Sequence, residues 1–435
     1  MMTIYDKNKC LILREDPESM NKNPLNILHT IGFDQLYPMI RCQLKFATPI
    51  DSDRLIKAVN LTAQVVPELF CRYEMRDNSW QPAVKDASEV IETVDADADV
   101  DTTPDWEKNA QIRFDIQADG RGNRMTITMS HILTDGSGFK QYLYLLSDCY
   151  NRGAAAITGV ENVVNLDWLE DLLKSHPAAA KHGDVDHPAK PLALPQLTNE
   201  TDEQPRHNVS GWRLTPELTA ALIQATHSQG VTVNDVCLTT FGKAVQAYDR
   251  GGDELAIPCP TDMRQKISKA HAALRIANHT ARFNPAIHSP QDEPIATAVA
   301  KMHVEMQRLK DQDQFLDSVR SLMAQYKSEP IEKLQQIVED NYHVRAIAFT
   351  NFGIIDDSRL VFEGTPLTDC LLTGSFRYAP MFQVACSTFK GQLNLGFNMI
   401  GTTDEVQVGR VVIHDMISRI KDFIAEAAIG ATVIR

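Results

Sequence analysis

The 435-residue sequence lacks several features that would assign it to a class at once. No CxxC pair occurs among its eight cysteines, which argues against a structural zinc site or a dithiol redox centre. No run of roughly 18 apolar residues occurs, so we expect no membrane span. The N-terminal residues contain no apolar segment of signal-peptide type. We therefore expect a cytoplasmic protein whose cysteines are buried free thiols.

Basic residues are also scarce. The chain has 43 Lys and Arg against 57 Asp and Glu, a formal net charge of −14. Proteins that bind nucleic acid need a basic face, so a nucleic-acid partner is not expected. The sequence also contains no GxGxxG, Walker or GxSxG motif. These absences exclude the most easily recognised nucleotide-binding and serine-hydrolase sites.

Aspartate alternates with alanine or valine at residues 95–101, which looks like the start of a calcium-binding loop. An EF-hand loop needs glycine at its sixth position and glutamate at its twelfth. This chain has Val100 and Trp106 there. We expect a solvated loop or an edge strand at this position, and no bound metal.

A composition shift divides the chain. Residues 175–205 hold five prolines and show no sustained periodicity, which is typical of a linker. Its three histidines, at 176, 182 and 187, have a spacing that suits no standard metal site. We predict an N-terminal domain at 1–175, a proline-rich linker at 176–205 and a C-terminal domain at 206–435.

Both halves mix strands and helices, which predicts mixed α/β sheets of the α+β kind rather than strict βαβ alternation. Strands are expected at 40–46, 70–75, 124–129, 212–214, 255–259, 346–355, 382–389 and 392–400. Helices are expected after Asp51 up to Pro67, at 138–151, after Thr215, at 232–249, through most of 291–325, and at 404–428. The last two strands should form a hairpin across Lys390-Gly391.

The segment 124–139 carries the clearest chemistry. A strand leads into His131, and Asp135 and Gly136 follow before a helix. An imidazole accepts a proton near neutral pH, and a side chain just past a strand end can face a cleft. A nearby carboxylate can orient the imidazole or brace the loop through an arginine. The plainer interpretation is a strand-end histidine and a helix-capping aspartate.

Residues 130–136, SHILTDG, resemble the HHxxxDG motif of the condensation-domain acyltransferases. That superfamily includes chloramphenicol acetyltransferase, condensation domains, polyketide-associated acyltransferases, wax ester synthases, alcohol acetyltransferases and BAHD enzymes. Further segments resemble family motifs in family order: 51–73 with its PELFCRY end, 231–236 (VTVNDV), 257–264 ending in Asp262-Met-Arg264, Asn278, and 350–353 (TNFG).

The resemblance implies two chloramphenicol-acetyltransferase-like domains in a V, with a central tunnel that donor and acceptor enter from opposite faces. His131 would be the general base that activates an alcohol or amine acceptor toward a thioester, with no covalent acyl-enzyme. The donor would be acyl-CoA or an acyl-carrier thioester, with no tightly bound cofactor and no metal. A discrete acyl or peptidyl carrier protein would be a possible partner.

The resemblance also implies supporting roles. Asp135 would be structural and would orient the loop by pairing with Arg264. Gly136 would allow the turn, and its N–H could help polarise the carbonyl. Thr350 and Asn351 would lie where a side-chain donor can approach the oxyanion or the acceptor, although they could equally cap a bulged strand end.

One position departs from the motif, because Ser130 replaces the first histidine. BAHD enzymes also keep only the second histidine, so the departure is compatible with activity. It favours a free-standing O- or N-acyltransferase. The alternatives are a free-standing condensation domain that uses carrier-bound substrates, or a catalytically silent condensation-like binding module.

Overall fold

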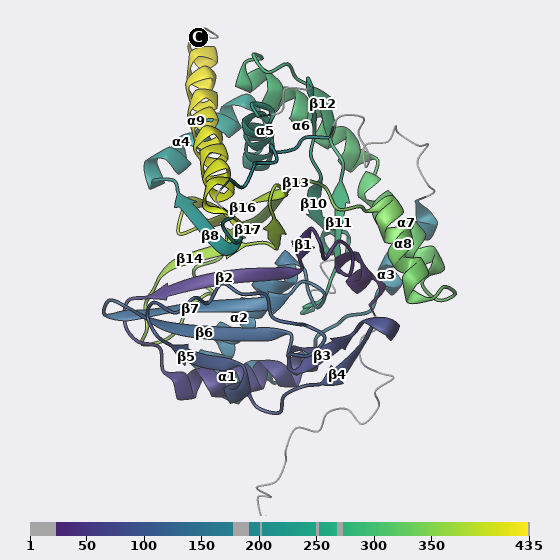
Figure 1. The fold of residues 1–435 in the computed structure, drawn as a ribbon, viewed down its shortest axis with the longest axis vertical. Helices are drawn as coiled ribbons and strands as arrows, with labels where there is room; N and C mark the ends of the chain where they lie inside the picture. The colour runs from purple at the N-terminus through teal and green to yellow at the C-terminus, as the bar shows by residue number, and fades with distance from the viewer. Residues whose placement is uncertain (1–22, 177–190, 201, 249–251, 268–272, 434–435) are drawn as a thin grey trace, which may run out of the picture.

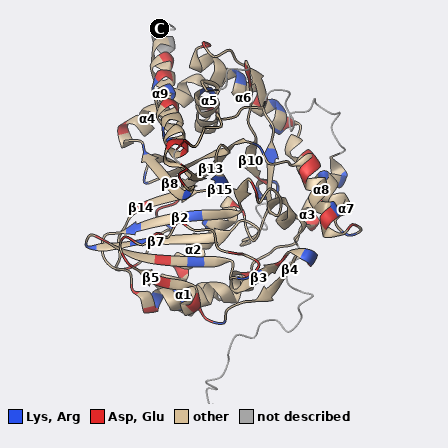
Figure 2. Ribbon diagram, viewed as in Figure 1, with Lys and Arg blue, Asp and Glu red and all other residues tan. Residues whose placement is uncertain are grey.

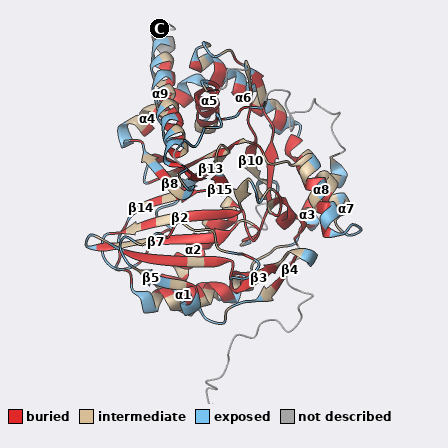
Figure 3. Cartoon of the chain, viewed as in Figure 1, coloured by how far each residue is buried: buried red, intermediate tan, exposed pale blue. Residues whose placement is uncertain are grey.

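The computed structural model describes residues 23–176, 191–200, 202–248, 252–267 and 273–433. They form two lobes, each built on a mixed sheet (Figure 1). Buried residues gather in the strands and on the inner faces of the helices (Figure 3). Charged residues are spread over the outer helices (Figure 2). The predicted mixed α/β fold is confirmed.

The N-terminal lobe has a five-stranded sheet in the order β14-β2-β7-β6-β5. Alternate residues of β2, such as Cys42 and Leu44, pack into the core formed with the first two helices. The others, including Arg41 and Gln43, point to the opposite face because side chains alternate along a strand. The elements are β2 (Met39–Phe46), α1 (Ser52–Val65), β3 (Cys71–Glu74), β4 (Ser79–Pro82), β5 (Ile91–Val94), β6 (Ile112–Asp119), β7 (Gly122–Ser130), α2 (Gly136–Arg152) and β14 (Leu367–Thr373).

The C-terminal lobe has a six-stranded sheet in the order β1-β15-β17-β16-β13, with β8 paired to β17. Long helices pack on it, and α5 and α9 contact each other along the upper part of the molecule (Figure 1). Its elements are β8 (Arg206–Arg213), α4 (Pro216–Gln229), α5 (Val233–Gln246), β9 (Glu254–Ala256), β10 (Cys259–Asp262), β11 (Thr280–Phe283), β12 (Ala286–His288), α6 (Ile295–Asp311), β13 (Ile347–Ile355), β15 (Phe376–Tyr378), β16 (Phe382–Phe389), β17 (Gln392–Gly401) and α9 (Thr403–Val433).

Three further helices lie beside the lobes: α3 (Asp167–Ser175), α7 (Asp317–Gln325) and α8 (Ile331–Asn341). A 3-10 helix, η2 (Pro24–His29), packs against α7 and α8. Its start follows from local sequence, because Asn23 accepts a hydrogen bond from Leu25 N and Pro24 occupies the first helical position. This short helix brings His29 to the interior.

Each half of the chain contributes a strand to the other lobe. β14, from the C-terminal half, pairs antiparallel with β2. β1 (Leu36–Tyr37), from the N-terminal half, pairs with β15. The division at 176–205 stays a prediction, and 177–190 and 201 lie outside the described residues. In the described part of that segment, Leu192 and Leu194 pack in the C-terminal core.

Local sequence signals predicted most elements. Asp51 caps α1 through Arg54 N at 3.0 Å, and the hairpin β16–β17 turns at Lys390 and Gly391, both with positive φ. Residues 255–259, expected as one strand, instead belong to two, β9 and β10. The strand expected at 212–214 begins earlier, at Arg206, and ends at Arg213. The helix expected at 404–428 is confirmed, and it runs from Thr403 to Val433.

Other sequence predictions concern single residue types. The described cysteines are free and buried, as expected, and Cys10 lies outside the described residues. Within the described ranges, no group of histidine, cysteine and acidic side chains is arranged to hold a metal ion. The described helices include none that is both long and apolar enough to cross a membrane.

Candidate active site

The loop that joins β7 to α2 carries His131 and Asp135. It is fixed at its start by Ser130, whose Oγ accepts a hydrogen bond from Ile132 N at 3.2 Å. His131 N donates to Pro38 O at 3.1 Å. Ser130 is fully buried. Ser130, which replaces the first motif histidine, therefore supports the loop from its buried side.

Asp135 is the buried anchor of this loop. Its Oδ1 accepts from Gly138 N at 2.8 Å, which caps α2. Its Oδ2 accepts from Arg264 Nη1 at 2.9 Å and from His279 N at 2.6 Å. Burial alone would raise the pKa of the Asp135 carboxyl, but the Arg264 charge and these hydrogen bonds hold it below its ordinary value. Asp135 is therefore an ionised structural group.

Arg264 is the predicted partner of Asp135, and the structure brings the two together. Besides Asp135, Nη1 donates to Asp262 Oδ1 at 2.8 Å. Nη2 donates to Arg275 O at 2.9 Å and Ala277 O at 2.7 Å, and Nε also donates to Arg275 O at 3.2 Å. The guanidinium thus uses all of its N–H donors to tie the loop to the segment 275–277.

Asn278 supports the loop from the other side. Its Nδ2 donates to the backbone oxygens of His131 at 3.0 Å and Ile132 at 2.7 Å. The same group lies 3.4 Å from Asn26 Oδ1, and Asn26 in turn donates to Asn78. These asparagines are buried, so they form a polar brace inside the molecule. The sequence pointed to Asn278 alone, through the family resemblance.

The His131 ring stacks on the ring of His29, with centroids 3.8 Å apart and planes 20° apart. Its Nδ1 is buried and has no hydrogen-bond partner. Burial lowers the pKa of His131, although its own backbone carbonyl and the Asp135 charge offset part of that effect. The imidazole is therefore neutral at pH 7 and able to accept a proton.

Sequence reasoning missed His29, because nothing near Pro24–His29 marks it as functional. Burial lowers the pKa of His29 well below its ordinary value, and the neighbouring His131 lowers it further. It also missed His279, whose ring is buried and whose pKa falls to about 3, first through burial and then through Arg264. Both side chains stay neutral at pH 7.

Gly136 and Gly138 are required by close packing rather than by backbone conformation, since neither has a positive φ. A Cβ on Gly136 would lie 2.7 Å from the ring of Phe352. A Cβ on Gly138 would lie 2.1 Å from Thr134 Oγ1. At this turn, β13 and the loop therefore pack directly against the first turn of α2, and a side chain at position 136 or 138 would clash with them.

Two cavities adjoin at this point. One, of about 140 Å³, contains His131 and His29. The other, of about 480 Å³, contains Lys140, Lys310 and Asn351. The two share five lining residues: Asp135, Gly136, Pro260, Thr280 and Thr350. The first turn of α2 and Thr350 therefore separate a cavity holding the imidazole from a larger one with two lysines.

Thr350 and Asn351 lie on β13 at this boundary. Asn351 Nδ2 donates to Asn234 Oδ1 at 3.1 Å, and its Oδ1 accepts from Gly353 N at 2.8 Å. The register of β13 on β16 shifts just after Asn351. The Asn351 side chain thus braces a bulge, which is the plainer of its two predicted roles. Thr350 lines both cavities and is better placed to meet a substrate.

Several solved structures share this architecture. The chain superposes on polyketide synthase associated protein 5 from Mycobacterium tuberculosis with a TM-score of 0.61, 12% identity, and coverage of 92% of this chain and 97% of that one. It also superposes on the first condensation domain of the calcium-dependent antibiotic synthetase. The TM-score is 0.61, the identity is 16%, and the match covers 94% of this chain and 95% of that one. The chain has the condensation-domain fold.

The chain also superposes on trichothecene 15-O-acetyltransferase from Fusarium sporotrichioides, with a TM-score of 0.58, 11% identity, and coverage of 92% of this chain and 95% of that one. This agrees with the resemblance to condensation-domain and chloramphenicol-acetyltransferase-like proteins. No family pattern and no curated protein matches the sequence itself. At these identities the likeness establishes the condensation-domain fold alone.

Proposed function

We propose that the protein transfers an acyl group from a thioester to the hydroxyl or amine of a small-molecule acceptor, with His131 as general base. The observation that carries this proposal is the neutral imidazole of His131, which lies next to the wall shared by the two cavities. The loop that bears it is held in place by the ion pair of Asp135 and Arg264. The solved structures with this fold include an acetyltransferase and a condensation domain. That likeness supports the reaction class.

The proposed step needs no covalent acyl-enzyme. The acceptor O–H or N–H gives its proton to His131 Nε2 while the acceptor atom bonds to the thioester carbonyl carbon. The tetrahedral intermediate then collapses, the C–S bond breaks, and the leaving thiolate takes the proton back from the imidazolium. The products are an ester or amide and a free thiol. The N–H of Gly136, at the first turn of α2, and the Thr350 hydroxyl are our candidates for polarising the carbonyl.

The larger cavity is our candidate for the donor arm. CoA and carrier-bound donors are anionic, and Lys140 and Lys310 line this cavity. Lys140 also donates to the backbone oxygen of Phe352 on β13. We propose that the acceptor meets the thioester from the His131 side. A carrier-bound donor and a silent binding module remain the alternatives to test.

An assay of thiol release distinguishes these functions. The protein would be incubated with acetyl-, medium-chain and long-chain acyl-CoA, or with an acyl carrier protein bearing the same chains, together with a mixture of alcohols and amines. We expect acceptor-dependent thiol release from CoA donors. Release only from the carrier would favour the condensation-domain alternative. Binding of the carrier without release from any donor would indicate the silent module.

The pH dependence follows from the lowered pKa of His131. Only the neutral imidazole can accept the proton, so kcat/KM should fall about tenfold per pH unit once the pH drops below that pKa. Because burial places the pKa below the ordinary value of 6.5, activity should stay level from about pH 8 to 6.5 and fall at more acidic pH. Circular dichroism at each pH would control for unfolding. An acid limb centred above pH 7 would contradict the assignment.

A further inference from the structure

The sheet of the N-terminal lobe is unusual on the face that lies away from α1 and α2. Its strands pair so that polar side chains lie next to one another across the sheet, for example Arg41 beside Thr128 and Gln43 beside Thr126. Arg41, Thr126 and Thr128 are at most 3% exposed. A polar sheet face normally contacts water. Here it is covered instead.

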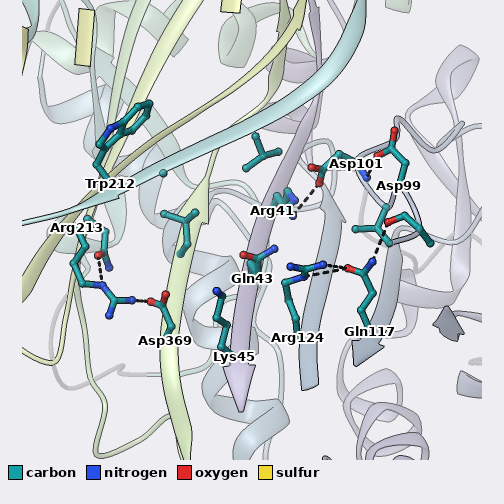
Figure 4. A pocket seen from close by; sticks show the side chains of 16 residues that line it. Arg41, Gln43, Lys45, Asp99, Asp101, Gln117, Arg124, Trp212, Arg213 and Asp369 are labelled. Atoms are coloured by element: carbon teal, nitrogen blue, oxygen red, sulfur yellow. Dashed lines mark hydrogen bonds and ion pairs between the residues drawn. The ribbon is translucent and has the colours of Figure 1, made fainter. Parts of the chain in front are cut away.

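Two segments form the cover. One is the aspartate-rich loop 95–101, which Gln117 holds in place by donating to Asp95 O at 3.2 Å and Ala98 O at 2.9 Å. The other is β8, whose residues Val209, Gly211, Trp212 and Arg213 line the cleft, with Arg213 paired to Asp369 of β14 (Figure 4). Between the cover and the sheet is a cleft of about 430 Å³. The volume is in the range that holds a small molecule.

The cleft leads from solvent to a buried charge. Lys45, at its outer end, has a side chain 42% exposed, whereas the Arg41 side chain is 2% exposed. Arg41 Nη2 pairs with Asp101 Oδ1 at 2.9 Å. Its Nε and Nη1 are buried and have no hydrogen-bond partner. A guanidinium with two unused nitrogens therefore lines the closed end of the cleft.

The other charges of the cleft already have partners of their own. Arg213 pairs with Asp369, and it also donates to Asn394 Oδ1 at 3.3 Å. Arg124 donates twice to Gln117 Oε1, at 3.1 and 2.9 Å. Among the residues that line the cleft, Arg41, Lys45, Arg124 and Arg213 face Asp99, Asp101 and Asp369. The buried Asp115 carboxylate also interacts with Arg41, but its ion pair is with Arg113. The two unused nitrogens of Arg41 can therefore still donate to a further acceptor.

We propose that this cleft is a second binding site, for a small polar molecule that carries a carboxylate. The carboxylate would accept charge-assisted hydrogen bonds from Arg41, and Gln43, beside it on β2, would bond to the polar remainder. The cleft shares no lining residue with the two cavities at His131. The site is therefore spatially separate from the cavities of the proposed acyl transfer.

The test measures binding by calorimetry to matched pairs of compounds: glucuronate against glucose, and succinate and citrate against succinamide. We expect the carboxylates to bind and the neutral compounds not to bind. Arg41→Gln should weaken binding at least tenfold. Gln43→Phe should also remove binding, because the larger side chain fills the cleft and leaves the ion pair of Arg41 intact. Arg76→Gln, at an exposed position of the N-terminal lobe outside the cleft lining, should bind as the natural protein does.

His131→Ala should bind the probes as tightly as the natural protein does. The KM of the acceptor, measured in the natural protein with and without a probe, then shows whether the carboxylate belongs to the acceptor or to a separate ligand. If a bound carboxylate also raises the KM of the acceptor, the site holds a remote part of the acceptor. If KM stays constant, it holds a separate ligand. The proposal is overturned if none of the carboxylates binds at 20 mM, if the neutral compounds bind equally, or if both Arg41→Gln and Gln43→Phe retain full affinity.

Discussion

Replacing His131 by alanine is expected to reduce kcat by about 10²–10⁴-fold, the range typical for a lost general base. Without the imidazole, a water molecule would have to take the proton of the acceptor. The cavity at this position has a volume of only about 140 Å³. KM for the donor should change little, since the donor is expected in the neighbouring cavity. Steady-state thiol release, with both substrates varied, measures the two parameters separately.

A second histidine makes this experiment discriminating. His29 stacks on His131, and it could in principle take the proton instead. His29→Phe keeps an aromatic ring in the stack and removes the titratable group. We expect this variant to keep kcat within about tenfold of the natural protein. If His29→Phe abolished turnover and His131→Ala did not, the roles of the two rings would have to be exchanged.

Replacing Arg264 by alanine is the change expected to affect stability most. Asp135 and Arg264 are both at least nine-tenths buried, and removing one partner of such a pair leaves the other charge uncompensated. Losses of this kind cost about 3–5 kcal/mol. The variant also releases the segment 275–277 from the loop, so kcat should fall together with stability. Urea unfolding and thiol release would measure the two effects.

Arg419→Ala is a matched control. Arg419 pairs with Asp415 at 2.9 Å one helical turn away, and both side chains are more than a fifth exposed. Partly exposed pairs of this spacing contribute about 0.5 kcal/mol or less, so we expect little change in unfolding free energy. If Arg264→Ala were no more destabilising than Arg419→Ala, the ion pair with Asp135 would not be what holds the loop.

The same ion pair makes the free energy of unfolding depend on pH at acidic values. The pKa of Asp135 is lower in the folded protein, so the pair stabilises the fold above the ordinary carboxyl pKa near 3.8. That contribution is lost as the pH falls through the lowered value. Between pH 5 and 8 it is complete in the natural protein. In Arg264→Ala, burial raises the pKa of the uncompensated Asp135 carboxyl, so the stability difference between the two proteins should shrink as the pH falls.

The sequence predicted what depends on neighbours along the chain. The cap at Asp51 and the hairpin at Lys390-Gly391 are formed by residues a few positions apart. The pairing of Asp135 with Arg264 was predicted by resemblance, because the motifs occur in family order. The cap and the hairpin can be found by inspection of a short segment, whereas Asp135 and Arg264 lie 129 positions apart and were paired through the resemblance.

Long-range features could not be predicted in this way. His29 reaches His131 only because η2 packs against helices that lie more than 280 residues further along the chain. The alternation of residues 40–46 predicted a strand with one polar face, but not that loop 95–101 and β8 would cover that face. Such contacts depend on the arrangement of both lobes, and that arrangement is not visible in the periodicity of any one segment.

The exchange of strands between the lobes has a consequence for how such a chain can be inherited. The first sheet takes β14 from the C-terminal half, and the second takes β1 from the N-terminal half. A gene fragment that encoded either half alone would leave a sheet without one of its members. Recombination between related genes would therefore preserve folding best when it moves the whole chain as a single unit.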